Sequence, residues 1–177
     1  MADRPVNLLE PEIALLRRPG EGYVLRPGST ACPGLLGRAR PGDRLWVREP
    51  FHLDARFDDR APTAALQFGP VEAGVYWPAD HDGGTLPAGI GRRRFAREMP
   101  RLLHRAHLVV RSVRFVRLHD LSDCDILVQG FGDRDRFKLH WDAVHAPQAR
   151  SISGSAIRWK DNPWIVELLV QWRGVPL

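Results

Sequence analysis

An arginine-rich segment between residues 92 and 105 is the part of the chain best suited to bind an anion. Its members are Arg92, Arg93, Arg94, Arg97, Arg101 and Arg105, with Phe95 between them. Arginine contacts with phosphates release condensed counterions, and an aromatic ring can stack on a base. We therefore predict that this segment binds nucleic acid. The structural alternative is a solvated, charged loop.

The second candidate group is the pair Arg48 and Glu49, which follows the apolar run Leu45-Trp46-Val47. A carboxylate held beside a guanidinium can orient the edge of a base, or act as a general base if it is partly desolvated. A surface ion pair of little energetic value is the alternative. Trp46 is interpreted as core filling or as a stacking platform, and Trp159 and Phe95 are further stacking candidates.

No set of residues has the spacing of a metal site or a nucleophilic triad. The seven histidines form no convincing ligand set, and Cys32 and Cys124 are too few and too far apart for a zinc ribbon or a disulfide framework. Ser122 beside Asp123 and Cys124 is explained by the start of a helix. We expect no metal, no cofactor and reduced thiols.

The elements that must position these residues are short strands joined by turns. Alternating apolar residues predict strands over residues 44–49, 107–118 and 164–172, with shorter candidates at 23–25 and 75–77. Helical spacing and capping residues predict helices over 11–18, 122–129 and 135–144. Residues 52–74 and 146–161 are expected to be loops. This pattern predicts an α+β fold, a small mixed β-barrel with short flanking helices.

Composition and charge set the class of protein and of partner. With 177 residues and 44% hydrophobic residues, we expect a single domain, in which residues 1–40 form a helix and arm packed on residues 41–177. No apolar run approaches membrane-spanning length and no leader is visible, which predicts a cytoplasmic protein without a membrane partner. The net charge is +5, and all but Lys138 and Lys160 of the 26 basic residues are arginine. That balance permits a nucleic-acid partner, although a GC-rich genome also favours arginine.

Several motifs in this order resemble the ASCH domains of the PUA-like superfamily, particularly the phage and prophage type. They are Gly42-Asp43-Arg44-Leu45-Trp46-Val47-Arg48-Glu49, Met99-Pro100-Arg101 and Asn162-Pro163-Trp164. The resemblance covers residues 40 to 172 and implies a PUA-like barrel with helices at its openings. It also implies a cleft lined by the Arg48–Glu49 pair and by the segment that contains Arg101 and Arg105.

The resemblance does not carry over the catalytic residues of the family. Hydrolytic relatives have a turn with a lysine and a threonine after the first helix, whereas this chain has Arg17 to Tyr23 there, without either residue. A guanidinium stays protonated and cannot act as a base or nucleophile. We therefore expect RNA or a modified nucleobase to bind without catalysis. The alternatives are a hydrolase acting on acylated cytidine or RNA with Glu49 as base, and a phage-derived module that binds an acidic protein.

Overall fold

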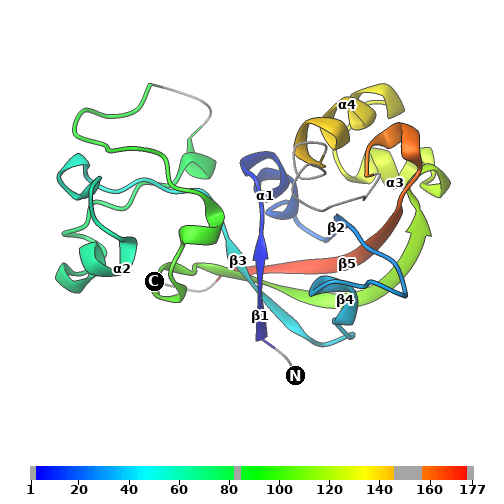
Figure 1. The fold of residues 1–177 in the computed structure, drawn as a ribbon, viewed down its shortest axis with the longest axis horizontal. Helices are drawn as coiled ribbons and strands as arrows, with labels where there is room; N and C mark the ends of the chain where they lie inside the picture. Colours follow the sequence, from blue (N-terminus) through cyan, green and yellow to red (C-terminus); the bar gives the residue numbers. More distant parts are fainter. Residues whose placement is uncertain (1–2, 82–84, 146–156, 175–177) are drawn as a thin grey trace. The chain divides into compact units, whose positions relative to one another are not determined.

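The computed structural model describes residues 3–81, 85–145 and 157–174, which form an α+β fold (Figure 1). The elements in chain order are β1 (Asp3–Asn7), α1 (Glu10–Leu16), β2 (Glu21–Pro27), β3 (Arg44–Arg48), α2 (Pro62–Ala65), β4 (Ala106–Arg117), α3 (Asp123–Val128), α4 (Arg134–His145) and β5 (Trp164–Gly174), with several 3-10 turns between them. In the described ranges, no helix has the length and apolar character that a membrane span requires.

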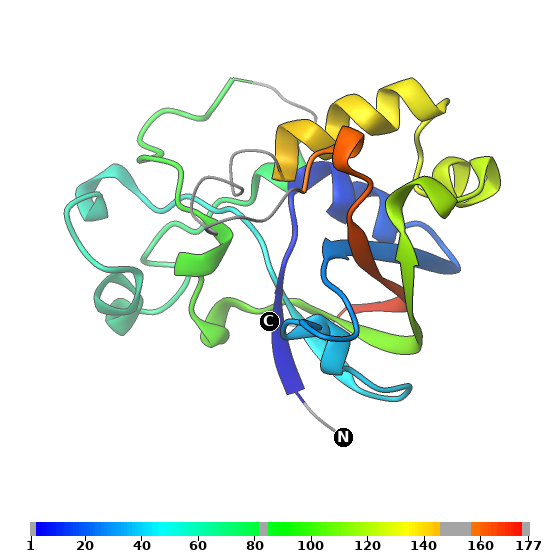
Figure 2. The same ribbon diagram turned by 45° about the vertical axis from the view of Figure 1, so that its right-hand side comes forward.

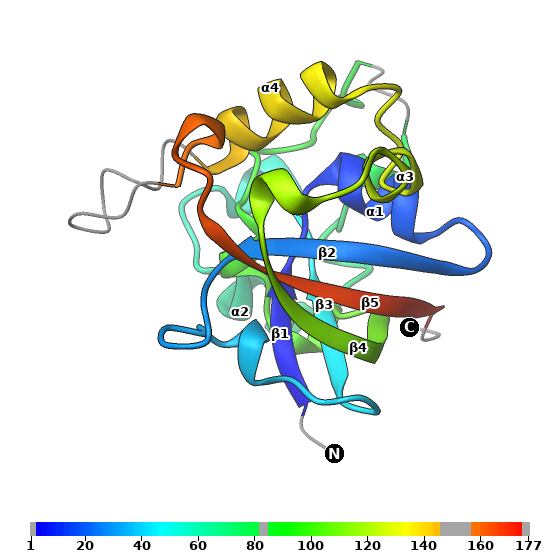
Figure 3. The same cartoon turned by 90° about the vertical axis from the view of Figure 1, so that its right-hand side faces the viewer.

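Five strands form one mixed sheet in the order β1-β3-β4-β5-β2. β1 runs parallel to β3, with Val6 opposite Val47, and β2 runs antiparallel to β5, with Val24 opposite Leu168 (Figure 3). The prediction that residues 44–49, 107–118 and 164–172 share one sheet is confirmed. The sheet ends at β1 and β2 and, over the described residues, is not closed into a barrel.

The two edge strands explain why the sheet stays open. β1 contains Pro5 and β2 ends with Pro27. Proline has no N–H to donate to a neighbouring strand, so within sheets it is largely confined to edges. The sequence pattern also hid β1, because of its five residues only Val6 is buried. We did not predict a strand over residues 3–7.

The chain forms two compact units, each described by itself below. Among the described residues, the first unit holds 20–43, 109–145 and 157–171, and the second holds 3–19, 44–81, 85–108 and 172–174. Residues 1–40, predicted to be a helix and arm packed on residues 41–177, supply β1 and α1 to the second unit and β2 to the first.

In the first unit, α3 and α4 pack on β2, β4 and β5 through one apolar cluster (Figure 2). The cluster is Leu25, Leu118, Leu121, Ile126, Phe137, Trp141 and Ile165. Ser122 caps α3 by accepting a hydrogen bond from the backbone N–H of Asp125, as its spacing predicts. The predicted helices over 122–129 and 135–144 are confirmed, and α4 begins one residue earlier. The predicted loop 146–161 falls largely outside the described residues.

The second unit has little regular structure beyond α1, α2, β1 and β3. Its core, which includes Phe51, Leu53, Phe57 and Met99, lies under a series of 3-10 turns. The predicted strand over 75–77 is only an isolated bridge between His52 and Tyr76. The chain is drawn together tightly at Gly91, where a Cβ atom would lie 2.2 Å from Oδ1 of Asp58, so any side chain there would displace the neighbouring turn.

Candidate nucleic-acid interface

A fully buried carboxylate, Glu49, lies in the second unit immediately after β3. Nε and Nη2 of Arg105 donate to its two carboxylate oxygens, each at 2.7 Å. Glu49 has no exposed surface, and the Arg105 side chain is 15% exposed. This bidentate geometry is the strongest that a guanidinium and a carboxylate can form. This pair therefore connects the residue after β3, Glu49, to the residue before β4, Arg105.

Two further charged residues extend this pair. Arg17, at the end of α1, donates to Asp80 at 2.6 Å and lies 4.0 Å from Glu49, while Arg105 also hydrogen-bonds Asp80. Asp80 ends the 3-10 turn Pro78–Asp80. Two positive and two negative side chains thus alternate around one point. We call Arg17, Glu49, Asp80 and Arg105 the Glu49 network.

The network shifts the pKa of two of its members, Asp80 and Arg105, in the direction that keeps them charged. Burial on its own raises the pKa of Asp80, but hydrogen bonds from Arg105 and Arg17 outweigh burial and hold it below its usual value. Burial on its own lowers the pKa of Arg105, and the hydrogen bonds to Glu49 and Asp80 raise it above the ordinary value. Both groups are therefore ionised near neutral pH.

Two indole rings cover the guanidinium groups of the network. Arg105 lies over the Trp77 ring, 4.4 Å from its centroid, and Arg17 lies over Trp172 at 5.5 Å. Trp77 is buried and belongs to the core of the second unit. Cation–π contacts of this kind fix the plane of a guanidinium and leave its edges to donate hydrogen bonds.

The expected pairing of Arg48 with Glu49 is not observed. Arg48 instead lies over the Trp46 ring at 4.6 Å, and its Nε has no hydrogen-bond partner among the described residues. Both oxygens of Glu49 are occupied by Arg105, so this carboxylate cannot take a proton from water or substrate unless Arg105 first moves away. Sequence reasoning selected Glu49 and Arg105 and missed Arg17 and Asp80. Their signal was weak, because both lie at turns that separate them widely in the chain.

The arginines between residues 92 and 101 have mainly internal partners. Arg93 bonds to Glu10 at 2.6 Å, Arg101 pairs with Asp3, and Arg92 lies 3.8 Å from Glu98. These three pairs are largely exposed, so each stabilises the fold only slightly.

Arg94 is wholly buried, and its Nη2 donates to the carbonyl of Phe57 at 2.7 Å. Burial lowers its pKa, and the neighbouring Arg92 lowers it further. Because no surface of Arg94 is exposed, it cannot reach a phosphate.

Arg97 differs from the rest of the segment. Over the described part of the chain it has no acidic partner, and its guanidinium lies 4.7 Å above the ring of Phe95. Phe95 is 54% exposed. An exposed ring beside an unneutralised cation is the arrangement on which a base stacks while its phosphate is bound.

Of the three stacking candidates, Phe95 is the most exposed. Trp46 is 6% exposed and lies near the guanidiniums of Arg48 and Arg101, at 4.6 and 5.6 Å. Trp159 is half-buried in the first unit, where it contacts His119 and Phe137. Trp46 and Trp159 are therefore packing residues in this structure.

Neither cysteine is paired and no metal centre is formed by the side chains that the structure describes. Cys32 and Cys124 are exposed thiols. Within the described ranges, no group of three or more His, Cys, Asp or Glu side chains is close enough to hold an ion.

Comparisons with protein-family models, with curated proteins and with solved structures found no match. The likeness to ASCH domains therefore stays a prediction from the order of the motifs. What the site can do has to be argued from its geometry and charge.

Proposed function

We propose that the protein binds RNA, or a modified nucleobase, through its second unit. The observation that carries this proposal is the exposed pair of Arg97 and Phe95. Most of the arginines around it are neutralised by acidic side chains, whereas Arg97 keeps its charge available. An aromatic face and a free guanidinium within 5 Å of each other suit one nucleotide of a single strand.

The second unit is also rich in guanidinium groups that lie over aromatic rings. Besides Arg97 on Phe95, these are Arg17 on Trp172, Arg48 and Arg101 on Trp46, Arg56 on Phe57, and Arg105 on Trp77. Significant contacts of this type occur about once per 70 to 80 residues in proteins generally. Because Trp46, Phe57 and Trp77 are buried, their contacts hold arginines against the core, whereas Phe95 offers an exposed ring beside Arg97.

The Glu49 network supplies the recognition of a base edge in this proposal. Arg17 and Asp80 are about one-third exposed, at 30% and 34%, and the hydrogen bond between them would have to open for a base edge to use their donor and acceptor atoms. Adjacent donor and acceptor groups match the edges of nucleobases. Glu49 and Arg105 hold the two in place from beneath. The resemblance to ASCH domains implies a cleft of the same kind. The open sheet of this chain differs from the PUA-like barrel of that family.

The proposal can be tested by fluorescence anisotropy with labelled RNA and DNA 12-mers at about 50 mM and about 200 mM salt, where phosphate contacts make affinity fall steeply. Phe95→Ala should weaken RNA binding roughly 5- to 100-fold, the value of one stacked base. Arg97→Gln should weaken it and reduce its salt dependence.

Two variants in the first unit serve as matched controls, Leu139→Ala for an exposed apolar side chain and Arg38→Gln for an exposed arginine. Both should bind like the parent. A parent protein that binds neither nucleic acid at low salt would reject the proposal. Equal losses in the control and interface variants would reject the assignment of the site. The hydrolase and the protein-interaction module stay untested predictions.

A further inference from the structure

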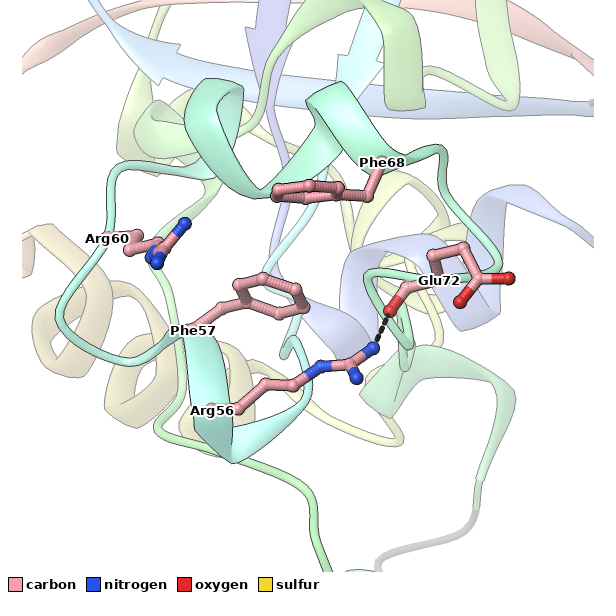
Figure 4. Close-up of a pocket in the computed structure, with 5 residues that line it drawn as sticks. All are labelled: Arg56, Phe57, Arg60, Phe68 and Glu72. Carbon is pink, nitrogen blue, oxygen red and sulfur yellow. Dashed lines mark hydrogen bonds between the residues drawn. The ribbon is translucent and has the colours of Figure 1, made fainter.

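A pocket of about 490 Å³ opens in the second unit. It is lined by Arg56, Phe57, Arg60, Phe68 and Glu72 (Figure 4). The 3-10 turns Ala55–Phe57 and Leu66–Phe68 supply the two rings, whose centroids are 6.1 Å apart with 24° between their planes. The volume is in the range of small-molecule sites.

One ring of the pocket is buried and the other is exposed. Phe57 is 6% exposed and belongs to the core. The guanidinium of Arg56 lies over its ring, 4.8 Å from the ring centroid. Phe68 is 56% exposed and precedes Gly69, whose φ is +91°. A flat group inserted between two rings needs about 7 Å between their planes. The ring centroids are 6.1 Å apart, so the proposal requires the exposed Phe68 ring to move outward, while the buried Phe57 ring serves as the stationary platform.

The charged side chains of the pocket are not equivalent. Arg56 is already engaged, since it lies on Phe57 and hydrogen-bonds the carbonyl of Glu72. Arg60 is exposed, and among the described residues its guanidinium has no ion pair or hydrogen bond. The Glu72 carboxylate is likewise unpaired in the described part of the chain. In Figure 4, Arg60 and Glu72 lie on opposite sides of the two rings.

This arrangement defines the polarity of a ligand. Stacked phenyl rings favour a flat heterocycle, a free guanidinium binds a phosphate, and a free carboxylate accepts hydrogen bonds from amino and imino N–H groups. A carboxylate near the phosphate would repel it, so the phosphate belongs on the Arg60 side. The base then presents its N–H donors to Glu72. Guanine fits best, because its neighbouring N–H groups can donate to both carboxylate oxygens.

We propose that this pocket binds one nucleotide, preferably guanylate, with its base against Phe57 and Phe68, its phosphate on Arg60 and its N–H edge on Glu72. As a second subsite on the RNA-binding surface, it rests on the proposed function. As a nucleotide pocket, it can be tested alone.

The direct test is titration of the labelled protein with guanosine monophosphate, guanosine and ribose 5-phosphate, followed by backbone amide NMR. Guanosine monophosphate should shift amides within residues 56–72 and bind at least fivefold more tightly than either fragment. Phe68→Ala and Arg60→Gln should each weaken it fivefold or more, while Phe68→Tyr, which keeps the ring, should bind within twofold of the parent. Glu72→Gln should remove the preference over uridine monophosphate.

Leu139→Ala and Arg38→Gln are again the controls, and an unchanged amide spectrum away from residues 56–72 establishes that each variant is folded. The pocket assignment is overturned if guanosine monophosphate leaves amides 56–72 unshifted, or if Phe68→Ala and Arg60→Gln bind it as tightly as the parent does.

Measuring RNA binding with the same variants separates this inference from the proposed function. Loss of RNA affinity in Phe95→Ala but not in Phe68→Ala would support the interface and overturn the second subsite. Guanylate binding in the pocket by a protein that binds no RNA would support the nucleotide pocket and reject the proposed function. Loss in both variants would support both.

Discussion

Each unit contains a buried glutamate that accepts two hydrogen bonds from one arginine, and the two pairs have nearly the same geometry. In the second unit, Arg105 donates to Glu49 with two hydrogen bonds of 2.7 Å. In the first, Arg114 donates to Glu167 at 2.5 and 2.9 Å. The glutamate side chains are 0% and 3% exposed. Local geometry alone would assign the two pairs the same role.

Their surroundings differ in what covers the arginine. Arg105 is 15% exposed and is also held by Asp80 and Trp77. Arg114, within β4, is 51% exposed and lies 3.6 Å from a further acidic partner, Asp125 of α3. Water can therefore replace much of what Arg114 provides, whereas protein groups surround most of Arg105. The comparison teaches that the exposure of the cation decides what a buried ion pair contributes.

The largest effect is expected from Arg105→Met, which leaves Glu49 buried without a partner. The free energy of unfolding should fall by about 3–5 kcal/mol, the usual cost of breaking a buried pair. Urea denaturation measures this. The double variant Arg105→Met with Glu49→Leu should recover most of the loss, since no charge then stays buried. A single variant as stable as the parent would contradict the comparison.

As the pH is lowered, the first unit should lose stability at a higher pH than the Glu49 network does. Burial, followed by the charges of Arg26 and His140, lowers the pKa of His145 to about 3. This histidine is neutral when folded but binds a proton near pH 6.5 when unfolded, so stability is complete above about pH 6.5 and falls as the pH drops toward 3.

The slope in that window should be about 1.4 kcal/mol per pH unit, or roughly 2 kcal/mol between pH 6.5 and 5. Urea denaturation at a series of pH values, in the parent and in His145→Phe, measures the contribution. Equal pH dependence in both proteins would rule it out.

Arg114→Met should cost less than Arg105→Met, about 1 kcal/mol, because half of the removed guanidinium was already in water. Glu167 would regain contact with solvent where Arg114 had covered it. Denaturation side by side with Arg105→Met measures the difference between the two pairs. A cost for Arg114→Met equal to that of Arg105→Met would mean that exposure is not the deciding variable.

The smallest effect on stability is expected from Asp80→Asn, below about 1 kcal/mol, because this side chain is one-third exposed. The pKa of Asp80 is lowered, so its contribution is present above pH 3.8 and is lost as the pH falls through the lower, folded value. Asp80→Asn should therefore differ from the parent near pH 7 and converge with it in strong acid. Thermal melts at pH 7 and pH 2.5 test this, and no convergence would show that another group is responsible.

The regular elements could be predicted because their patterns are local. Alternation identified β3, β4 and β5, and the Ser122 cap located α3. β1 was missed because an edge strand buries few residues and tolerates proline, so its pattern is weak. The open sheet was missed for the same reason, since closure depends on which strands are edges.

The site was harder to predict, since its residues meet only through the fold. Glu49 and Arg105 were selected from charge and position, but the sequence could not show that each is the other's partner. The sequence predicted a binding segment that included Arg92, Arg93 and Arg101. In the fold these side chains pair with Glu98, Glu10 and Asp3, respectively. The pocket between Phe57 and Phe68 has no signature, because two phenylalanines eleven residues apart are ordinary in any loop.

The pairing of β2 with β5 has a consequence for synthesis on the ribosome. The partner of Pro27 is Ile165, so β2 emerges long before the strand that completes it. At roughly 5–20 residues per second, a nascent chain would expose Val24 and Leu25 for on the order of ten seconds. Glu21 and Arg26 flank this apolar core with charge, as gatekeepers against aggregation do. Until β5 has been synthesised, β2 therefore stays unpaired and a chaperone could bind it.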